Sequence, residues 1–197
     1  MSPLSTDSQG RPGSVRGGLR LIHLNGASGI GKSTVARRYA DQHPGVLDLD
    51  TDHVVSLIGG WRENFWATLP LARRLAIAMA ETHLRSGFSV VMPQLATHVD
   101  EVSGFEAAAR AAGASYVEIA LTAATPHALE RYAARSTPDG PARDIDAILA
   151  DAGGLAVVER IHGHLAAYLT RRPRCLVIDT EGLDVDQTYA AVLTALS

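Results

Sequence analysis

Residues 19–41 read LRLIHLNGASGIGKSTVARRYAD and pass from a short apolar run through a glycine loop into a helical pattern. Within this stretch, residues 26–33 read GASGIGKS, which satisfies the pattern G-x-x-x-x-G-K-[ST]. In that pattern the backbone N–H groups of the loop cradle phosphates, and the helix that follows directs its positive N-terminal end toward them. The stretch therefore predicts a phosphate-binding loop between a strand and a helix.

The residue types in this loop match the chemistry of phosphate binding. Glycines at 26, 29 and 31 permit positive φ angles and a close approach of bare backbone to phosphate. The ammonium group of Lys32 can reach the β and γ phosphates, and the hydroxyl of Ser33 can ligate Mg²⁺. We expect ATP to contact the whole loop, which comprises Gly26, Ala27, Ser28, Gly29, Ile30, Gly31, Lys32, Ser33 and Thr34.

The flanking residues distinguish this motif from a glycine turn that matches by chance. An apolar run at residues 19–24 precedes the loop, and a helical pattern at residues 35–40 follows it until His43-Pro44-Gly45. A strand before the loop and a helix after it are the context that the motif requires. Nucleoside triphosphate binding is thus the first functional prediction.

The length and composition of the chain fit one domain. With 197 residues, of which 46% are hydrophobic and 20% charged, it can bury one core and is short for two. Residues 1–18 are rich in Ser, Gly, Pro and Arg and nearly free of apolar side chains, so we expect a flexible arm. Residues 19–197 would form the folded domain.

Charge, cysteine content and hydropathy argue against several classes of protein. The net charge is −3, which disfavours a nucleic-acid partner. The single cysteine, Cys175, excludes an internal disulfide, and its apolar neighbours favour a buried strand position. Because no apolar run is long enough to span a bilayer and no secretory signal is found, we expect a cytoplasmic protein without a membrane partner.

Two carboxylates follow the second predicted strand, residues 46–50. In an open parallel sheet the carboxyl ends of the strands form the ligand-binding edge. On a strand, Asp50 and Asp52 would point to one face, so that one could hold Mg²⁺ through water and the other could meet a substrate hydroxyl. A purely structural alternative is that Asp50 or Thr51 caps a helix that starts near Val54.

Both tryptophans of the chain lie within residues 61–66, which read WRENFW. This cluster could anchor a helix that begins near Leu69, or it could form the wall of an acceptor pocket. In the second case Trp66 would line the pocket and Arg62 would bind an anionic or hydroxyl group of the acceptor. The helix itself is predicted to pack on the core through residues at helical spacing, namely Leu71, Leu75, Ala78, Met79 and Thr82.

A third apolar strand, residues 88–92, runs into the segment 93–98, in which Gln94 could orient a substrate. No acidic residue follows this strand, although many P-loop ATPases carry a metal-binding carboxylate there. The metal and base functions are therefore expected from Asp50 and Asp52.

Arginines border a loop-forming stretch, residues 136–141, which reads STPDGP. Arg131 and Arg135 lie one helical turn apart before it, and Arg143 follows it. These side chains could belong to a lid, near residues 136–143, that closes over the phosphates, with Arg131 binding the nucleotide and Arg135 assisting catalysis. A solvated arginine face is the structural alternative.

Strand and helix patterns alternate along the rest of the chain. Further strands are expected at residues 115–121 and 175–179, and further helices at 99–113, 144–170 and 185–196. This alternation predicts a three-layer α/β fold, with helices on both faces of a five-stranded parallel sheet and right-handed crossovers.

The order of strand, phosphate-binding loop, helix and the element LDLDTDHV, residues 47–54, resembles the P-loop small-molecule kinases, including shikimate kinase, gluconate kinase and chloramphenicol phosphotransferase. Residues 90–94 and 113–114 look more like the tunicamycin-resistance type of ATP-binding protein. The resemblance covers residues 19–196 in layout. It implies a central P-loop strand, Asp50 as the acid on the metal side, and Asp52 as the acid on the acceptor side and the base.

Motif and resemblance together predict an ATP- and Mg²⁺-dependent phosphotransferase that acts on a hydroxyl of a small molecule, for example an antibiotic or a sugar-like metabolite. Lys32 would stabilise charge on the transferring phosphoryl group, and Asp52 would deprotonate the acceptor. Two alternatives stay open: a non-catalytic ATP-binding resistance or regulatory protein, and a nucleotide kinase.

Overall fold

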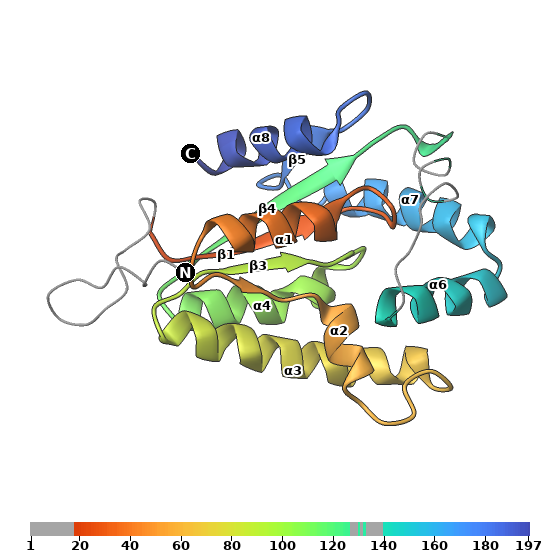
Figure 1. Ribbon diagram of the computed structural model, residues 1–197, viewed down its shortest axis with the longest axis horizontal. Coiled ribbons are helices and arrows are strands. Elements are labelled where there is room, and N and C mark those ends of the chain that lie inside the picture. Colours follow the sequence, from red (N-terminus) through yellow and green to blue (C-terminus); the bar gives the residue numbers. More distant parts are fainter. Residues whose placement is uncertain (1–17, 127–129, 131, 133–139) are drawn as a thin grey trace, which may run out of the picture.

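The computed structural model describes residues 18–126, 130, 132 and 140–197. Five strands form one parallel sheet in the order β2-β3-β1-β4-β5, with helices on both faces (Figure 1). The strands are β1 (Arg20–Asn25), β2 (Leu47–Asp48), β3 (Val90–Pro93), β4 (Ser115–Thr122) and β5 (Leu176–Asp179). The described helices are α1 (Lys32–Gln42), α2 (Thr51–Ser56), α3 (Phe65–Arg85), α4 (Val99–Ala111), α6 (Pro141–Asp151), α7 (Leu155–Leu169) and α8 (Val185–Leu196). The predicted three-layer α/β fold is confirmed.

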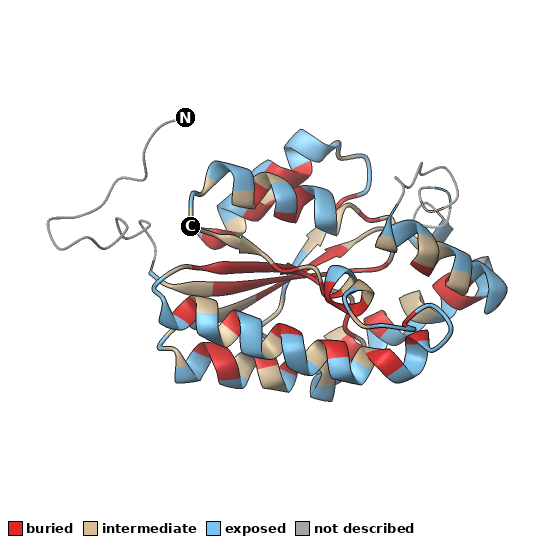
Figure 2. Ribbon diagram, turned by 60° about the horizontal axis from the view of Figure 1, so that its bottom comes forward, coloured by how far each residue is buried: buried red, intermediate tan, exposed pale blue. Residues whose placement is uncertain are grey.

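The phosphate-binding loop follows the central strand, as the resemblance implied. β1 pairs with β3 on one side, where Leu21 lies opposite Val90, and with β4 on the other, where Arg20 lies opposite Ser115. All of β1 after Arg20 is buried, and Figure 2 shows these buried strands between two layers of helices. A strand that is covered on both faces has a nearly continuous apolar sequence, and this pattern made β1 predictable from the sequence.

α1 and α8 lie side by side on one face of the sheet (Figure 1). Their apolar sides share a buried cluster with the sheet, formed by Ile22, Leu24, Val35, Ala36, Tyr39, Val91, Ile119, Leu121, Tyr189 and Val192. Because this cluster fixes the direction of α1, it also fixes the loop that leads into the helix.

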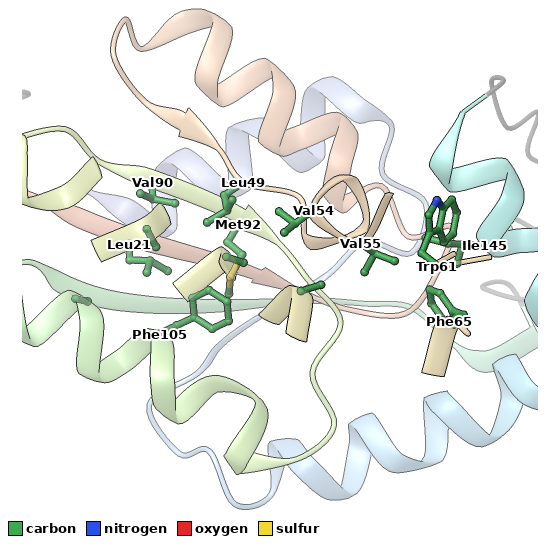
Figure 3. Packing of buried hydrophobic residues seen from close by; sticks show 14 of the residues in the cluster. Leu21, Leu49, Val54, Val55, Trp61, Phe65, Val90, Met92, Phe105 and Ile145 are labelled. Carbon is green, nitrogen blue, oxygen red and sulfur yellow. The ribbon is translucent and has the colours of Figure 1, made fainter. Parts of the chain in front are cut away.

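The opposite face carries α3 and α4, and one buried cluster extends from there to α2 and α6. Figure 3 shows Trp61 and Phe65 beside Ile145 of α6, while Val54 and Val55 of α2 continue the cluster toward the sheet. Trp61 is 3% exposed and Phe65 is 6% exposed. These two aromatic residues therefore act as the hydrophobic anchor that was one of the two expectations for residues 61–66.

α3 begins at Phe65 rather than near Leu69, and it presents a different face to the core from the one predicted. Leu71, Leu75 and Met79 are 41%, 44% and 41% exposed, so the expectation that they pack inward is wrong. The middle of the buried side consists instead of small residues at four-residue spacing, Ala72, Ala76 and Ala80, and Phe65 and Leu84 are buried toward its two ends.

The close approach of α3 to α4 explains this choice of face. A Cβ atom on Gly104 of α4 would lie 2.4 Å from Cδ1 of Ile77 on α3. Ala72, Ala76 and Ala80 belong to the same buried cluster as Phe105 and Ala109 of α4, and leucines at the alanine positions would overpack this cluster. Leu71, Leu75 and Met79 consequently face outward.

Other boundaries agree with the sequence patterns or differ by a few residues. α6 and α7 are separated at Gly153 and Gly154, where the helical pattern broke. β2 is much shorter than the predicted strand 46–50. Cys175 lies before β5 and is partly buried, so it is not the buried strand residue that we expected. Among the helices of the described residues, none combines the length and apolar content needed to cross a membrane.

Candidate functional site

Two positions of the phosphate-binding loop must be glycine, because neighbouring backbone leaves no room for a Cβ atom there. Gly26 has φ +146°, and a Cβ atom there would lie 2.6 Å from the carbonyl oxygen of Leu121 in β4. Gly29 has φ +82°, and a Cβ atom there would lie 3.1 Å from Cα of Tyr132. The loop is therefore held between the end of β4 and the residue Tyr132, which leaves no space for side chains at these positions.

Lys32, the first residue of α1, lies in the middle of the site. Its Nζ donates a hydrogen bond to the carbonyl oxygen of Ala27 at 2.9 Å, so the side chain folds back over the loop. Its positive charge contributes to lowering the pKa of His23 and of His162, and it opposes the rise in the pKa of Asp52. Lys32 is thus close to groups from three other parts of the chain.

Ser33 and Asp50, the two residues predicted to serve the metal, are brought together. The hydroxyl of Ser33 donates to Oδ2 of Asp50 at 3.2 Å. A hydroxyl and a carboxylate beside a phosphate loop are oxygen ligands of the kind that Mg²⁺ takes together with phosphates and water. These two side chains fit a magnesium ion, which would neutralise charge on the phosphates of bound ATP.

Asp50 is also the N-cap of α2, and its Oδ1 accepts a hydrogen bond from the backbone N–H of Asp52 at 3.0 Å. The structural alternative for Asp50 is therefore confirmed. The expectation that both acids share one face of a strand is wrong, because β2 ends at Asp48 and α2 begins at Thr51. Asp52 instead lies in the first turn of a helix that the Asp50 side chain caps.

The carboxyl group of Asp52 has the electrostatics of a general base. Its pKa is raised from the ordinary value of 3.8 to about 6, first by burial and then by the negative charge of Asp50. The positive charges of Lys32 and His53 oppose this rise, while Asp146 adds to it. A carboxylate with such a pKa is ionised at neutral pH and still basic enough to accept a proton.

Asp146 and His162 belong to this site but were missed by the sequence reasoning. Asp146, on α6, acts electrostatically on Asp52 and accepts a 3.5 Å hydrogen bond from the hydroxyl of Tyr132. Nε2 of His162, on α7, is buried and has no hydrogen-bond partner within the described part of the chain. Burial lowers the pKa of His162, and Lys32 lowers it further, so the imidazole is neutral. No local motif marks either residue, because both reach the site only through the packing of α6 and α7.

Besides Asp52, three residues were predicted to contact the acceptor: Arg62, Trp66 and Gln94. Each of them lies in a different environment. Arg62 forms an ion pair with Asp144 of α6, with Nη2 2.7 Å from Oδ2, and its guanidinium lies 4.8 Å from the centroid of the Trp61 ring. Trp66 is 56% exposed and contacts the ring of Phe65. Gln94 follows β3, which pairs with β1, and its side-chain amide donates to the carbonyl oxygen of Leu95. The two arginines expected in the lid, Arg131 and Arg135, lie outside the described residues, as do residues 136–139 of the predicted lid.

A buried polar residue, Asn25, holds the start of the phosphate-binding loop through hydrogen bonds. Oδ1 of Asn25 accepts from the backbone N–H of Gly26 at 2.8 Å and from that of Ala96 at 3.0 Å. Its Nδ2 donates to the carbonyl oxygen of Ala96 at 3.1 Å and to Oε1 of Glu118 at 3.2 Å. One side chain thereby ties the start of the loop to the segment after β3 and to the middle of β4.

Glu118 continues this buried network. Its Oε1 also accepts from the hydroxyl of Tyr168 at 2.7 Å, and its Oε2 accepts from Nε of Arg172 at 2.8 Å. Nearby, Nε2 of His23 lies 2.7 Å from the carbonyl oxygen of Gln94, and Nδ1 lies 2.7 Å from the hydroxyl of Tyr116. Burial lowers the pKa of His23, so the ring is neutral. Since a carbonyl can only accept, Nε2 carries the proton and Nδ1 accepts from Tyr116.

Comparisons with known proteins agree with this geometry. The profile of the AAA domain family matches residues 21–155. None of the curated proteins matches the chain. The structure of the tunicamycin resistance protein of Deinococcus radiodurans is similar, with a TM-score of 0.59 and 18% identity over 91% of this chain and 96% of that one.

Two solved kinases have the same fold. A gluconokinase from Sinorhizobium meliloti matches with a TM-score of 0.52 and 17% identity, over 89% of this chain and 88% of that one. A sugar kinase from Janibacter sp. matches with a TM-score of 0.52 and 18% identity, over 89% of this chain and 93% of that one. The resemblance to P-loop small-molecule kinases is thus confirmed at the level of the fold. Because the family profile covers more than half of its residues, the chain belongs to the AAA domain family.

Proposed function

We propose that this protein transfers the γ-phosphoryl group of ATP to a hydroxyl group of a small molecule, in a reaction that requires Mg²⁺. The observation that carries the proposal is the position of Asp52. Its carboxyl group, with a pKa raised to about 6, lies within electrostatic reach of Lys32 of the phosphate-binding loop and of the Asp50 carboxylate. A protein that only binds a nucleotide has no need for a raised carboxylate pKa beside that loop.

The proposed reaction follows from the roles of these side chains. The acceptor oxygen attacks the γ-phosphorus, a new P–O bond forms, and the bond to the β-phosphate oxygen breaks to release ADP. Asp52 takes the proton of the acceptor hydroxyl, while Lys32 and the loop amides stabilise the charge on the transferring group. Ser33 and Asp50 would hold the magnesium ion that accompanies ATP.

The acceptor would lie among α2, α6 and α7. Asp52, Asp146 and the unpartnered nitrogen of His162 supply polar groups from these helices. Carboxylate and neutral imidazole groups can bind several hydroxyls of one polyol or sugar-like molecule. We infer an acceptor with more than one hydroxyl, such as a sugar-like metabolite or an antibiotic, which agrees with the gluconokinase, the sugar kinase and the tunicamycin resistance protein that share the fold.

Acceptor-dependent release of ADP tests the proposal. The purified protein would be supplied with Mg·ATP and a panel that includes gluconate, shikimate, hexoses, nucleoside monophosphates and tunicamycin. At least one alcohol should raise ADP release above the background of ATP hydrolysis, and Asp52→Asn should abolish this increase while ATP binding persists. Lys32→Ala should lose about a hundredfold in rate or more. Asp41→Asn, which removes an exposed carboxylate at the end of α1, is the control and should behave as the wild type.

The results also separate the alternatives. Phosphorylation of a nucleoside monophosphate would identify a nucleotide kinase. ATP and Mg²⁺ binding without acceptor-dependent ADP release across the panel would favour a non-catalytic resistance or regulatory protein. Full activity of Lys32→Ala would contradict all three hypotheses, because each of them requires ATP at this loop.

A further inference from the structure

A cleft of about 540 Å³ lies on the α4 and α7 side of the sheet, away from the phosphate-binding loop. Its walls come from the end of α4, the start of β4 and the connection between α7 and β5, and it is lined in part by Glu106, Arg110, Tyr116, Arg171 and Arg174. β4 starts opposite the first residue of β1, whereas the loop follows the last residue of β1. The cleft therefore faces the opposite end of the strands from the site described above.

The cleft is positively charged although the whole chain is acidic. Four arginines, at 110, 171, 172 and 174, and two glutamates, at 106 and 118, are among its lining residues, whereas the net charge of the chain is −3. The sequence RRPR at residues 171–174 supplies three of these arginines, and it has no role in the proposed phosphotransfer.

Both glutamates pair with the same arginine, Arg172. Arg172 donates to Oε2 of Glu118 at 2.8 Å and is also paired with Glu106. Tyr168 and Asn25 occupy the other oxygen of Glu118, so this buried carboxylate is fully hydrogen-bonded. The guanidinium of Arg172 is consequently occupied by these pairs at the floor of the cleft, away from its opening.

The remaining three arginines are available to a ligand. Arg110, Arg171 and Arg174 are exposed, and no ion pair of theirs occurs within the described part of the chain. Guanidinium groups are planar forks that bind phosphate and carboxylate with two parallel hydrogen bonds. Three of them around one cleft can bind more than one anionic group, and its volume lies in the range of small-molecule pockets.

We propose that this cleft is a second ligand site, which binds a small molecule carrying two or more negative charges on phosphate or carboxylate groups. The site is independent of the proposed phosphotransfer and of the phosphate-binding loop. The cleft would recognise the charge and spacing of the anionic groups through Arg110, Arg171 and Arg174, while Glu106 and Glu118 beneath them are paired with Arg172.

The test is isothermal titration calorimetry on the full chain at low ionic strength, with pyrophosphate in one arm and citrate in the other. A non-hydrolysable ATP analogue with one equivalent of Mg²⁺, so that little free metal is left to chelate the titrants, would first occupy the phosphate-binding loop. One equivalent of pyrophosphate or citrate should still bind, and the arm with the higher affinity distinguishes a phosphate ligand from a carboxylate ligand. Absence of binding in both arms would overturn the proposal.

Variants locate the binding. The double variant Arg110→Gln/Arg174→Gln should bind pyrophosphate or citrate at least tenfold more weakly than the wild type. Its melting temperature should be unchanged, because both side chains are exposed. Arg74→Gln removes an exposed arginine of α3 outside the cleft and should leave the affinity unchanged. Equal losses in both variants would mean nonspecific charge binding and would overturn the proposal. In Lys32→Ala, nucleotide binding should fail while citrate or pyrophosphate still binds, so the two proposals fail separately.

Discussion

The hydroxyl of Ser33 lies 3.2 Å from Oδ2 of Asp50, so the first turn of α1 meets the N-cap of α2. Asp50 thus has two roles, one in the stability of α2 and one in the proposed metal site. The roles can be separated because asparagine caps a helix as well as aspartate does but lacks the negative charge.

Asp50→Asn should therefore leave the free energy of unfolding within about 0.5 kcal/mol of the wild type, whereas Asp50→Ala should lower it by about 1 kcal/mol. Both variants should require more Mg²⁺ for half-maximal activity, since the charge is lost in each. Urea denaturation and magnesium titration of the reaction rate measure the two effects. A normal magnesium requirement in Asp50→Asn would exclude Asp50 from the metal site.

The raised pKa of Asp52 predicts the pH dependence of the proposed reaction. Asp52 must be ionised to accept the proton, so kcat should rise as the pH passes through about 6 and level off above it. Well below this pH, kcat should fall about tenfold for each pH unit. A pH–rate profile with the best acceptor measures this. A flat profile from roughly pH 5 to pH 8 would show that another group is the base.

The same pKa predicts a cost in stability. The pKa of Asp52 is higher in the folded state, about 6, than its ordinary value of 3.8, so the folded state binds the proton more tightly. This favourable contribution is complete below pH 3.8 and is lost as the pH rises through about 6. Asp52→Asn should accordingly be more stable than the wild type at pH 8, by up to about 3 kcal/mol.

Urea denaturation of Asp52→Asn and the wild type at pH 8 and pH 4 provides the measurement. The stability gain should be present at the higher pH and nearly absent at the lower one. A gain of equal size at both values would mean that it does not come from the ionisation of Asp52.

Gly26 should tolerate no side chain. In Gly26→Ala the new Cβ would lie 2.6 Å from the Leu121 carbonyl oxygen and 2.9 Å from Cγ2 of Ile30, at φ +146°. We expect a loss of about 2 to 4 kcal/mol in unfolding free energy from backbone strain and overpacking together. Gly31→Ala is the matched control, since Gly31 also has a positive φ, +103°, but a Cβ there meets nothing within 4 Å. If thermal denaturation gave equal losses for both variants, the contact with β4 would not be the cause.

The parts of the fold that could be predicted from sequence are those specified by local patterns. β1 is an apolar run because both of its faces are covered, and the loop after it has residue types that phosphate binding requires. The break at Gly153 and Gly154 was equally readable, because glycines there take positive φ angles. In each case the information lies within a few neighbouring residues.

The predictions that failed depended on tertiary contacts. Leu71 and Leu75 have the spacing of a buried helix face, but close packing against α4 selects the alanine face instead. Asp50 and Asp52 were assigned to a strand because their apolar neighbours suggested one, although Asp50 followed by Thr51 is also a helix-capping pattern. Asp146 and His162 were not predicted at all, since only the packing of α6 and α7 brings them to Lys32 and Asp52.

The pairing of β1 has a consequence for how the chain is made. β1 is synthesised before both of its partners, which are β3, beginning at Val90, and β4, beginning at Ser115. Contacts this distant along the chain form slowly, and the ribosome must first deliver the intervening residues. A nascent chain that ends before β4 would thus carry the complete phosphate-binding motif without the strand that shapes it at Gly26. During translation, nucleotide binding should appear only after β4 has emerged from the ribosome.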